Sequence, residues 1–176
     1  RSVELAEKYP QQIRAIIGVH PSDAHQIHAE MLQKLVELAE HPLVVGWGEI
    51  GLDYHYDDAP TKEVQAYAFR QQIDAAKALH LPIIIHERDA HQDTINILRE
   101  MKAGVNSGII HCFSGSWEMA KECMTMGFHI ALGGPVTYLN AKTPVEVASK
   151  IPLDYLLTET DCPYLSPHPY RGKLNK

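Results

Sequence analysis

Six short apolar segments recur along the 176 residues of the chain, and segments with helix signals separate them. A strand that is apolar on both faces is typical of a parallel sheet, because helices cover both sides of such a sheet. Strands that alternate with helices predict an α/β fold with right-handed crossover connections. The predicted strands span residues 15–19, 44–49, 83–86, 108–111, 128–132 and 155–161.

The segments between these strands carry helix signals. Apolar residues recur at helical spacing in four of them, and Thr143 to Glu146 forms a capping box with Pro144 at the first helical position. The Pro-rich residues 162–176 show no helical pattern. No linker, repeat or break in composition interrupts the chain, so we expect residues 1–176 to form a single domain.

Four of the predicted strands end in a side chain that can bind a metal ion: Glu49, His86, His111 and Asp161. The ends of parallel strands form a ring in a (β/α)8 barrel, whereas in an open sheet they are spread along an edge. Convergence of the four side chains therefore favours the barrel over an open doubly wound sheet. A mixed set of imidazole and carboxylate ligands suits zinc or another divalent ion of the first transition row.

Further polar residues lie at the same ends of the strands. His20 follows the first strand, and His55 lies six residues beyond Glu49. Arg88 lies two residues beyond the third strand's histidine and therefore points to the same side; a guanidinium there can bind a phosphate with two hydrogen bonds. The alternatives are that the two histidines form ordinary loop hydrogen bonds, and that Arg88 pairs with Glu87 or Asp89.

Charge and cysteine content narrow the functional classes. A net charge of −6 argues against an extended basic surface for nucleic acid, but a metal-lined pocket can still take a short anionic substrate. Cys112 adjoins His111, yet neighbours on a strand point to opposite sides, which argues against a thiol nucleophile. Three cysteines without a C-x-x-C motif indicate free thiols in a reducing compartment, so we expect a cytoplasmic protein with no membrane partner.

Six motifs run in order along the chain: Gly18-Val-His-Pro21, Gly48-Glu-Ile-Gly-Leu-Asp53, Ile85-His-x-Arg-Asp-Ala90, His111-Cys-Phe-Ser-Gly115, Thr160-Asp-Cys-Pro-Tyr-Leu165 and Arg171-Gly-Lys-x-Asn175. In these motifs the sequence resembles the TatD family of metal-dependent deoxyribonucleases, within the amidohydrolase-like barrels. Each motif alone is weak, but six in family order are highly specific.

The resemblance implies a (β/α)8 TIM barrel of the metallo-dependent hydrolase type, with one or two divalent ions (Mg, Zn, Mn or Co). Glu49 matches the family's bridging acid, His86 and His111 match ligands of one metal, and Asp161 matches a ligand of the other that can also act as base. Glu49 and Asp161 are thus the expected catalytic residues.

The substrate side of the resemblance is carried by His20, Arg88 and the Arg171 loop. It implies hydrolysis of phosphodiester bonds in DNA, with 3′-to-5′ exonuclease action on a single-stranded or end-bound substrate, by a monomer.

One departure from the family pattern concerns the strand count. The family begins with a strand carrying a His-x-His ligand pair and a further strand, and it continues into a helix beyond the Arg171 loop. We therefore expect six of eight barrel strands in this chain, an incomplete barrel without the first two strands and the last helix. Two other functions remain open: a related metal hydrolase acting on a cyclic amide, lactone or phosphotriester, and a catalytically impaired metal-binding fragment.

Overall fold

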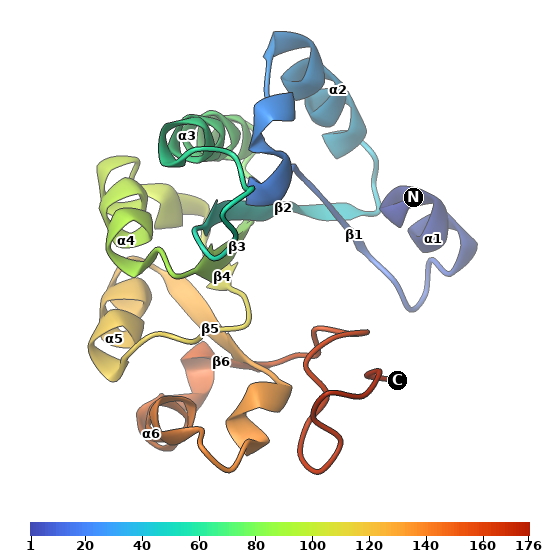
Figure 1. The fold of residues 1–176 in the computed structure, drawn as a ribbon. Helices are drawn as coiled ribbons and strands as arrows, with labels where there is room; N and C mark the ends of the chain where they lie inside the picture. The colour runs from blue at the N-terminus through green and yellow to red at the C-terminus, as the bar shows by residue number, and fades with distance from the viewer. The chain divides into compact units, whose positions relative to one another are not determined.

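The computed structural model describes residues 1–176, which divide into two compact units, an N-terminal unit of residues 1–108 and a C-terminal unit of residues 109–176. Six strands alternate with helices along the two units (Figure 1), as the apolar segments predict. No helix is both long enough and apolar enough to cross a lipid bilayer.

The N-terminal unit contains a parallel three-stranded arrangement in chain order. Strand β1 (Ala15–Ile17) pairs with β2 (Val44–Asp53), and β2 pairs with β3 (Ile83–Arg88). The helical elements of this unit are α1 (Ser2–Lys8), η1 (Pro21–Gln26), α2 (Ala29–Ala39), α3 (Lys62–Ala78), α4 (His91–Glu100) and η2 (Ala103–Asn106).

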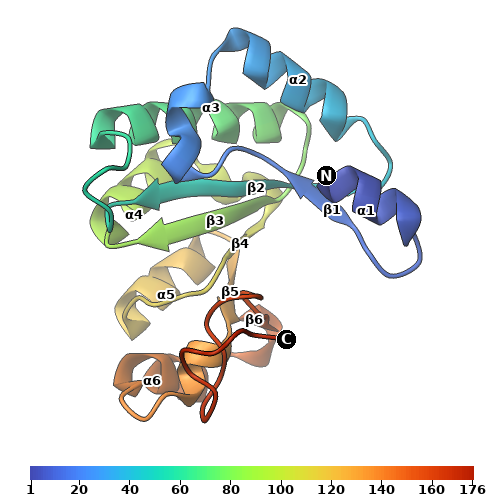
Figure 2. The ribbon, with the colours of Figure 1, turned by 45° about the vertical axis from the view of Figure 1, so that its right-hand side comes forward.

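The core of the N-terminal unit lies between β2 and α3. Trp47 and Ile50 of β2 are fully buried, as are Phe69 and Ile73 of α3. Figure 2 shows α3 running alongside β2. Burial of this apolar stripe is the main stabilising contribution to the unit and fixes α3 against the strands that carry the candidate site.

The C-terminal unit begins within β4 (Gly108–Ile110) and contains a second parallel pair, β5 (Phe128–Leu132) with β6 (Leu156–Thr158). Its helical elements are α5 (Trp117–Thr125), η3 (Gly134–Thr137), α6 (Lys142–Lys150) and η4 (Leu153–Tyr155). Phe128 and Ile130 of β5 and Ala120 and Cys123 of α5 are fully buried. Residues 162–176 contain no helix or strand, as their composition predicts.

Several element boundaries differ from the predictions: β1 and β4 end earlier than predicted, at Ile17 and Ile110, and β3 continues to Arg88. Strand β2 does not end at Glu49 but continues to Asp53, and β6 ends at Thr158, before the predicted residue 161. Helix α6 begins at Lys142, one residue before Thr143, and no side chain caps it, so the predicted capping box is wrong. Propensity locates an element, but neighbouring strands and packing decide where it ends.

Candidate metal centre

Glu49 lies at a β-bulge in β2. The ladder with β3 pairs Gly48 with Ile84 and Ile50 with Ile85, so Glu49 is the extra residue between them. A bulge leaves its residue outside the regular ladder and redirects the side chain, and bulges are common beside active sites. The extra residue explains why Glu49 occurs inside a strand rather than at its end.

Gly51 allows β2 to approach β3 closely at His86. Its φ is +144°, and a Cβ on Gly51 would lie 2.0 Å from the carbonyl oxygen of His86. No residue with a side chain fits this space, so the position requires glycine. The close approach holds the backbone of Glu49 and the backbone of His86 on neighbouring strands.

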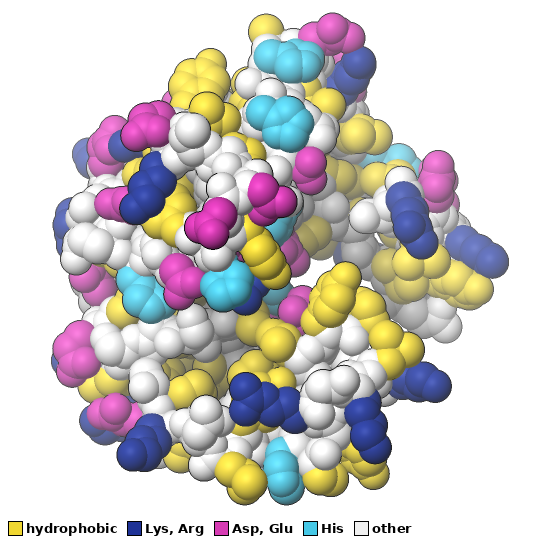
Figure 3. Space-filling view, viewed as in Figure 1, with side chains coloured by type: hydrophobic (Ala, Val, Ile, Leu, Met, Phe, Trp, Pro, Cys, Tyr) yellow, Lys and Arg dark blue, Asp and Glu magenta, His cyan; other side chains and the backbone are white.

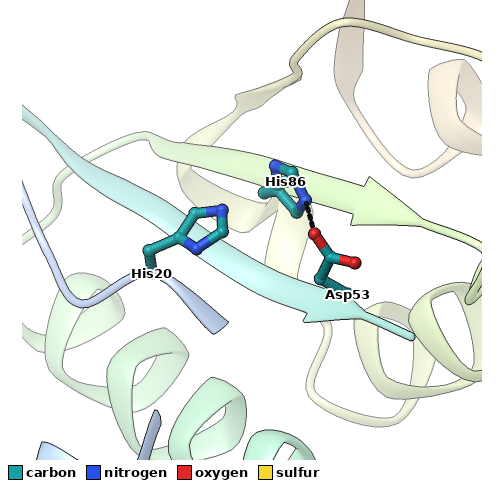
Figure 4. Close-up of side chains that lie close together, drawn as sticks. All are labelled: His20, Asp53 and His86. Atoms are coloured by element: carbon teal, nitrogen blue, oxygen red, sulfur yellow. Dashed lines mark hydrogen bonds and ion pairs between the residues drawn. The ribbon is translucent and has the colours of Figure 1, made fainter. Parts of the chain in front are cut away.

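His86 lies between two carboxylates. Its Nε2 is 3.0 Å from Oδ2 of Asp53, and its Nδ1 is 3.8 Å from Oε2 of Glu49 (Figure 4 shows the first contact). The shorter distance is a hydrogen bond in which the Nε2–H of His86 donates to Asp53, and Nδ1 faces Glu49. Two atoms that each lie about 2.0–2.2 Å from a shared ion are separated by less than about 4 Å, so Glu49 and His86 fit as two ligands of one metal.

His20 reaches the same place from the turn after β1. One ligand atom each from His20, Asp53 and His86 lie within 4.8 Å of one another, as Figure 4 shows, and the rings of His20 and His86 are 4.4 Å apart. The Nδ1 atom of His20 is 2.8 Å from Oγ of Ser22, which holds the ring in place. Two imidazoles and a carboxylate are a donor set that binds first-row divalent ions, so the residues present fit the predicted metal.

The C-terminal unit repeats the arrangement around His111. Its Nδ1 is 2.5 Å from Oε2 of Glu159, and its Nε2 is 3.8 Å from Oδ1 of Asp161. The other oxygen of Glu159 accepts a hydrogen bond from the backbone N–H of Cys112 at 3.0 Å. Both oxygens of Glu159 are therefore held, and Glu159 orients the His111 ring so that Nε2 faces Asp161.

Two buried glutamines of α3 fix the backbone on the N-terminal side of the site. Gln65 accepts a hydrogen bond from the N–H of Asp53 and donates one to its carbonyl, both at 2.8 Å. Gln72 does the same for Val19, the residue before His20, at 2.8 and 3.0 Å. The two glutamines are seven residues apart and hence on one helical face, so one helix holds the backbone of Asp53 and of the residue before His20.

Arg88 ends β3, directly opposite Asp53 in the ladder. Its Nη1 donates a hydrogen bond to the hydroxyl of Tyr56 at 3.2 Å, and its guanidinium lies 5.1 Å from the centre of that ring. Arginine has five N–H donors, so the guanidinium has further N–H groups that can bind a phosphate. The position of Arg88 beside Asp53 is compatible with its predicted role at the substrate.

The acids next to Arg88 have histidine partners. Glu87 is buried and lies 2.5 Å from Nδ1 of His91, and Asp89 lies 2.8 Å from Nδ1 of His55. Glu87 and Asp89, the two acids that the alternative prediction paired with Arg88, are therefore paired with histidines. His55 is thus held by a loop hydrogen bond, the alternative considered for it.

Arg171 belongs to the C-terminal unit and is held by two neighbours. Its Nη1 donates a hydrogen bond to Oδ1 of Asn140 at 3.2 Å, and its guanidinium lies 4.3 Å from the ring centre of Tyr138. The side chain is exposed and oriented, as a group that contacts substrate must be.

The four predicted ligands fall two in each unit, Glu49 with His86 and His111 with Asp161. That all four meet at one point stays a prediction. The sequence reasoning missed both orienting acids, Asp53 and Glu159, and both glutamines. Asp53 ends the Gly48-to-Asp53 motif, and Glu159 lies two residues before Asp161; this nearness in sequence to a predicted ligand was the available signal.

The chain is similar to known proteins in sequence and in fold. A protein-family model described as TatD related DNase matches residues 1–176. The chain belongs to the TatD family. It is 53% identical over all of its 176 residues to the uncharacterized metal-dependent hydrolase YabD of Bacillus subtilis, of which it covers 68%. Over 159 residues, 90% of the chain, it is 42% identical to the uncharacterized metal-dependent hydrolase YcfH of Escherichia coli K12, of which it covers 59%.

Solved structures of TatD proteins agree with the fold. The crystal structure of YJJV, a TatD homologue from Escherichia coli K12, matches with a TM-score of 0.90 and 35% identity over 100% of this chain and 68% of that one. An uncharacterized amidohydrolase from Saccharomyces cerevisiae matches in fold, with a TM-score of 0.77, 20% identity, and 97% of this chain and 62% of that one covered. These matches confirm the predicted fold class, the TIM-barrel type of the amidohydrolase-like proteins. The TatD membership and the names of its relatives identify the protein as a metal-dependent hydrolase.

Proposed function

We propose that this TatD protein hydrolyses phosphodiester bonds in DNA, as a divalent-ion-dependent exonuclease that works from the 3′ end of single-stranded or end-bound DNA. The observation that carries the proposal is the repeated unit of a histidine oriented by one carboxylate and separated by 3.8 Å from a second. Arg88, opposite Asp53 in the ladder, favours a phosphate-containing substrate over a neutral amide or lactone.

The mechanism assigns a task to each group of side chains. A bound divalent ion would lower the pKa of a water molecule and neutralise negative charge on the phosphoryl oxygens. Asp53 and Glu159 hold His86 and His111 in the orientation that binds such an ion. Asp161 accepts the proton of the attacking water, whose oxygen bonds to phosphorus while the bond from phosphorus to the 3′ oxygen breaks.

The substrate phosphate is held by the cationic and imidazole groups. Arg88 in the N-terminal unit and Arg171 in the C-terminal unit each bind phosphate oxygens of the DNA with their N–H donors, which stabilises the charge on these oxygens. His20 supports the phosphate at Arg88 from the turn after β1. Glu49 completes the ion site with His86.

The proposal extends to the setting in which the protein works. Mg, Mn, Zn and Co are the candidate ions, because all accept mixed imidazole and carboxylate ligands. The three cysteines form no disulfide with one another, which supports a location in the reducing cytoplasm. We expect the enzyme to act as a monomer without a membrane partner.

The experiment follows a 5′-labelled single-stranded oligonucleotide incubated with the whole protein and each of the four ions. Products that shorten progressively from the 3′ end are expected, and a 3′-terminal phosphorothioate should slow their appearance. The absence of cleavage with every ion at high occupancy would overturn the proposal.

The same assay tests the role of Glu49. Glu49→Ala should abolish cleavage, a loss of at least about 1,000-fold if the ion is bound only weakly without it. Its thermal unfolding should change little, since the side chain is 35% exposed. Glu30→Ala, an exposed acid of α2 in the same unit, is the matched control and should keep full activity. Activity that survives Glu49→Ala would make the central assignment wrong.

A further inference from the structure

Residues 162–176 form a closed loop rather than a loose tail. The backbone N–H of Asn175 donates to the carbonyl of Pro163 at 2.9 Å, which brings the two ends of the loop together. The hydroxyl of Ser166, itself buried, donates to the carbonyl of Lys173 at 2.7 Å across the loop. Compact loops with joined ends and internal hydrogen bonds are frequently functional. We refer to these residues as the 162–176 loop.

The loop is also fixed to η3 of the same unit. The backbone N–H of His168 donates to Oγ1 of Thr137 at 2.7 Å. A Cβ on Gly134 would lie 2.3 Å from the carbonyl oxygen of Leu165, so the loop packs directly on the backbone of η3. Side chains on the loop are therefore held on a firm base, which lowers the entropy lost when a ligand binds them.

The charge of the loop is opposite to that of the protein. The protein carries a net charge of −6, yet the 162–176 loop contains no aspartate or glutamate. Its cations, Arg171, Lys173 and Lys176, are all exposed. Figure 3 shows dark-blue and yellow side chains side by side over the C-terminal segment that Figure 1 draws in red. The loop is a local cationic surface on an anionic protein.

Aromatic rings accompany these cations. Tyr164 and Tyr170 are 69% and 58% exposed. The ammonium of Lys173 lies 5.6 Å from the ring centre of Tyr170, and Arg171 lies over Tyr138. Cations beside exposed rings are the combination that binds single-stranded nucleic acid, because the cations pair with phosphates while the rings stack on bases.

We propose that the 162–176 loop is a binding surface for single-stranded nucleic acid, with phosphates at Arg171 and Lys173 and bases on Tyr164 and Tyr170. The identity of the strand as DNA rests on the proposed function. The loop begins at the residue directly after Asp161, the proposed general base. A nucleic-acid strand bound to the first residues of the loop therefore lies close to Asp161. An acidic peptide offers charge but no bases, and so leaves the tyrosines unused.

The test measures binding without turnover. A fluorescein-labelled oligothymidylate is titrated with the whole protein in EDTA, and fluorescence anisotropy is followed from 50 to 200 mM NaCl. Lys173→Ala should weaken binding and lower the salt slope by about 0.7, the value for one lost phosphate contact on a single strand. Tyr170→Ala should weaken binding about 5- to 150-fold, the range for one lost base stack, whereas Tyr170→Phe should retain it.

Lys121 supplies the matched control. It belongs to α5 of the same unit, and its ammonium lies 5.8 Å from the ring centre of Trp117, so Lys121→Ala removes the same charge and the same kind of ring contact. The affinity of the Lys121→Ala variant for the oligonucleotide should equal that of the unaltered protein. Equal affinity in Lys173→Ala, Tyr170→Ala and Lys121→Ala would overturn the proposal.

Two further measurements separate binding of nucleic acid by the loop from other causes of weakened binding. An abasic oligonucleotide of the same length should bind more weakly than oligothymidylate; equal binding, or equal competition by an acidic peptide, would overturn the nucleic-acid assignment. Hydrolysis of bis(4-nitrophenyl) phosphate should be the same in Lys121→Ala and the unaltered protein, which shows that the control substitution leaves the reaction unaffected. If the protein binds oligothymidylate through the loop but cleaves no DNA, the proposed function fails and the loop surface stands.

Discussion

At the scale of single residues, the two histidines of the site depend on carboxylates with different tasks. His86 is held by Asp53 and faces Glu49, and His111 is held by Glu159 and faces Asp161. An acid that accepts the proton of one ring nitrogen fixes the lone pair on the other and raises the basicity of the ring. Removing an orienting acid should therefore weaken ion binding without removing a ligand.

Glu159→Gln tests this distinction in the C-terminal unit. The amide keeps an oxygen for the N–H of Cys112 but loses the charge beside His111, so the ion concentration for half-maximal activity should rise about 10- to 100-fold. Activity should recover at saturating ion. Glu146→Gln, an exposed acid of α6, is the control. A fall in maximal rate with no change in ion dependence would contradict the orienting role.

Tyr54 gives a prediction about pH. Burial, together with the hydrogen bond to Asp93 and that residue's charge, raises the pKa of Tyr54 from 10.0 to about 12. Because the folded state holds the proton more tightly than the unfolded state, this contribution to stability is complete below pH 10 and is lost as the pH rises through about 12. The difference in ultraviolet absorbance between the unaltered protein and Tyr54→Phe isolates this titration.

Asp93→Asn should lower the pKa of Tyr54 in that measurement, though not fully to its ordinary value, because burial of the phenol remains. The loss in unfolding free energy near pH 8 should be about 1 kcal/mol, typical of one hydrogen bond. Asp74→Asn, on the exposed face of α3, should leave the titration unchanged. An unaltered pKa in Asp93→Asn would contradict the assigned cause.

At the scale of elements, the hydrophobic pattern predicted α3 correctly but did not reveal its buried glutamines or the bulge in β2, and the reason is physical. It located α3 through Phe69 and Ile73, since apolar spacing reports directly on burial. It could not place Gln65 and Gln72 in the interior, because a glutamine is buried only where tertiary partners satisfy its amide. The bulge at Glu49 was hidden for the same reason: a bulge is a relation between two strands.

Gly51→Ala tests the close approach of β2 and β3. The new methyl group would lie 2.0 Å from the carbonyl oxygen of His86, so the strands must separate, and the loss in unfolding free energy should exceed about 4 kcal/mol. Gly172 has a φ of +83° and no atom within 4 Å of the equivalent Cβ, so Gly172→Ala should cost only about 1 kcal/mol. Denaturant unfolding compares the two, and similar losses would show that φ alone, rather than contact with β3, sets the cost.

At the scale of the whole molecule, the sequence predicted fold class and family through motifs spread along the entire chain. Six ordered motifs outweigh the weakness of each one, and the family match over residues 1–176 bears this out. The predicted single domain and the convergence of all four ligands remain predictions. Both depend on the mutual placement of residues 1–108 and 109–176, which no local pattern encodes.

Ion binding should stabilise the whole molecule. An ion at 100 times its dissociation constant adds about 2.7 kcal/mol to the unfolding free energy when it binds only the folded state. We expect Mn, Zn, Mg or Co to raise the melting temperature and a chelator to reverse the change. Glu49→Ala and His111→Ala should each reduce the shift, while Glu30→Ala should not. Identical melting curves with ion and with chelator would count against a folded-state ion site.

The bulge at Glu49 also limits how this segment can change in evolution or engineering. Trp47 and Ile50 pair with Ile83 and Ile85 and lie on one face, although they are three residues apart, because Glu49 stands outside the ladder. Deletion of Glu49 would join Gly48 and Ile50 in a regular ladder and remove the bulge, whereas insertion of one residue after Ile50 would shift every following side chain to the opposite face. Leu52 would turn out of the core and Asp53 away from His86. Chain length, more than residue identity, is therefore what variants of this strand must preserve.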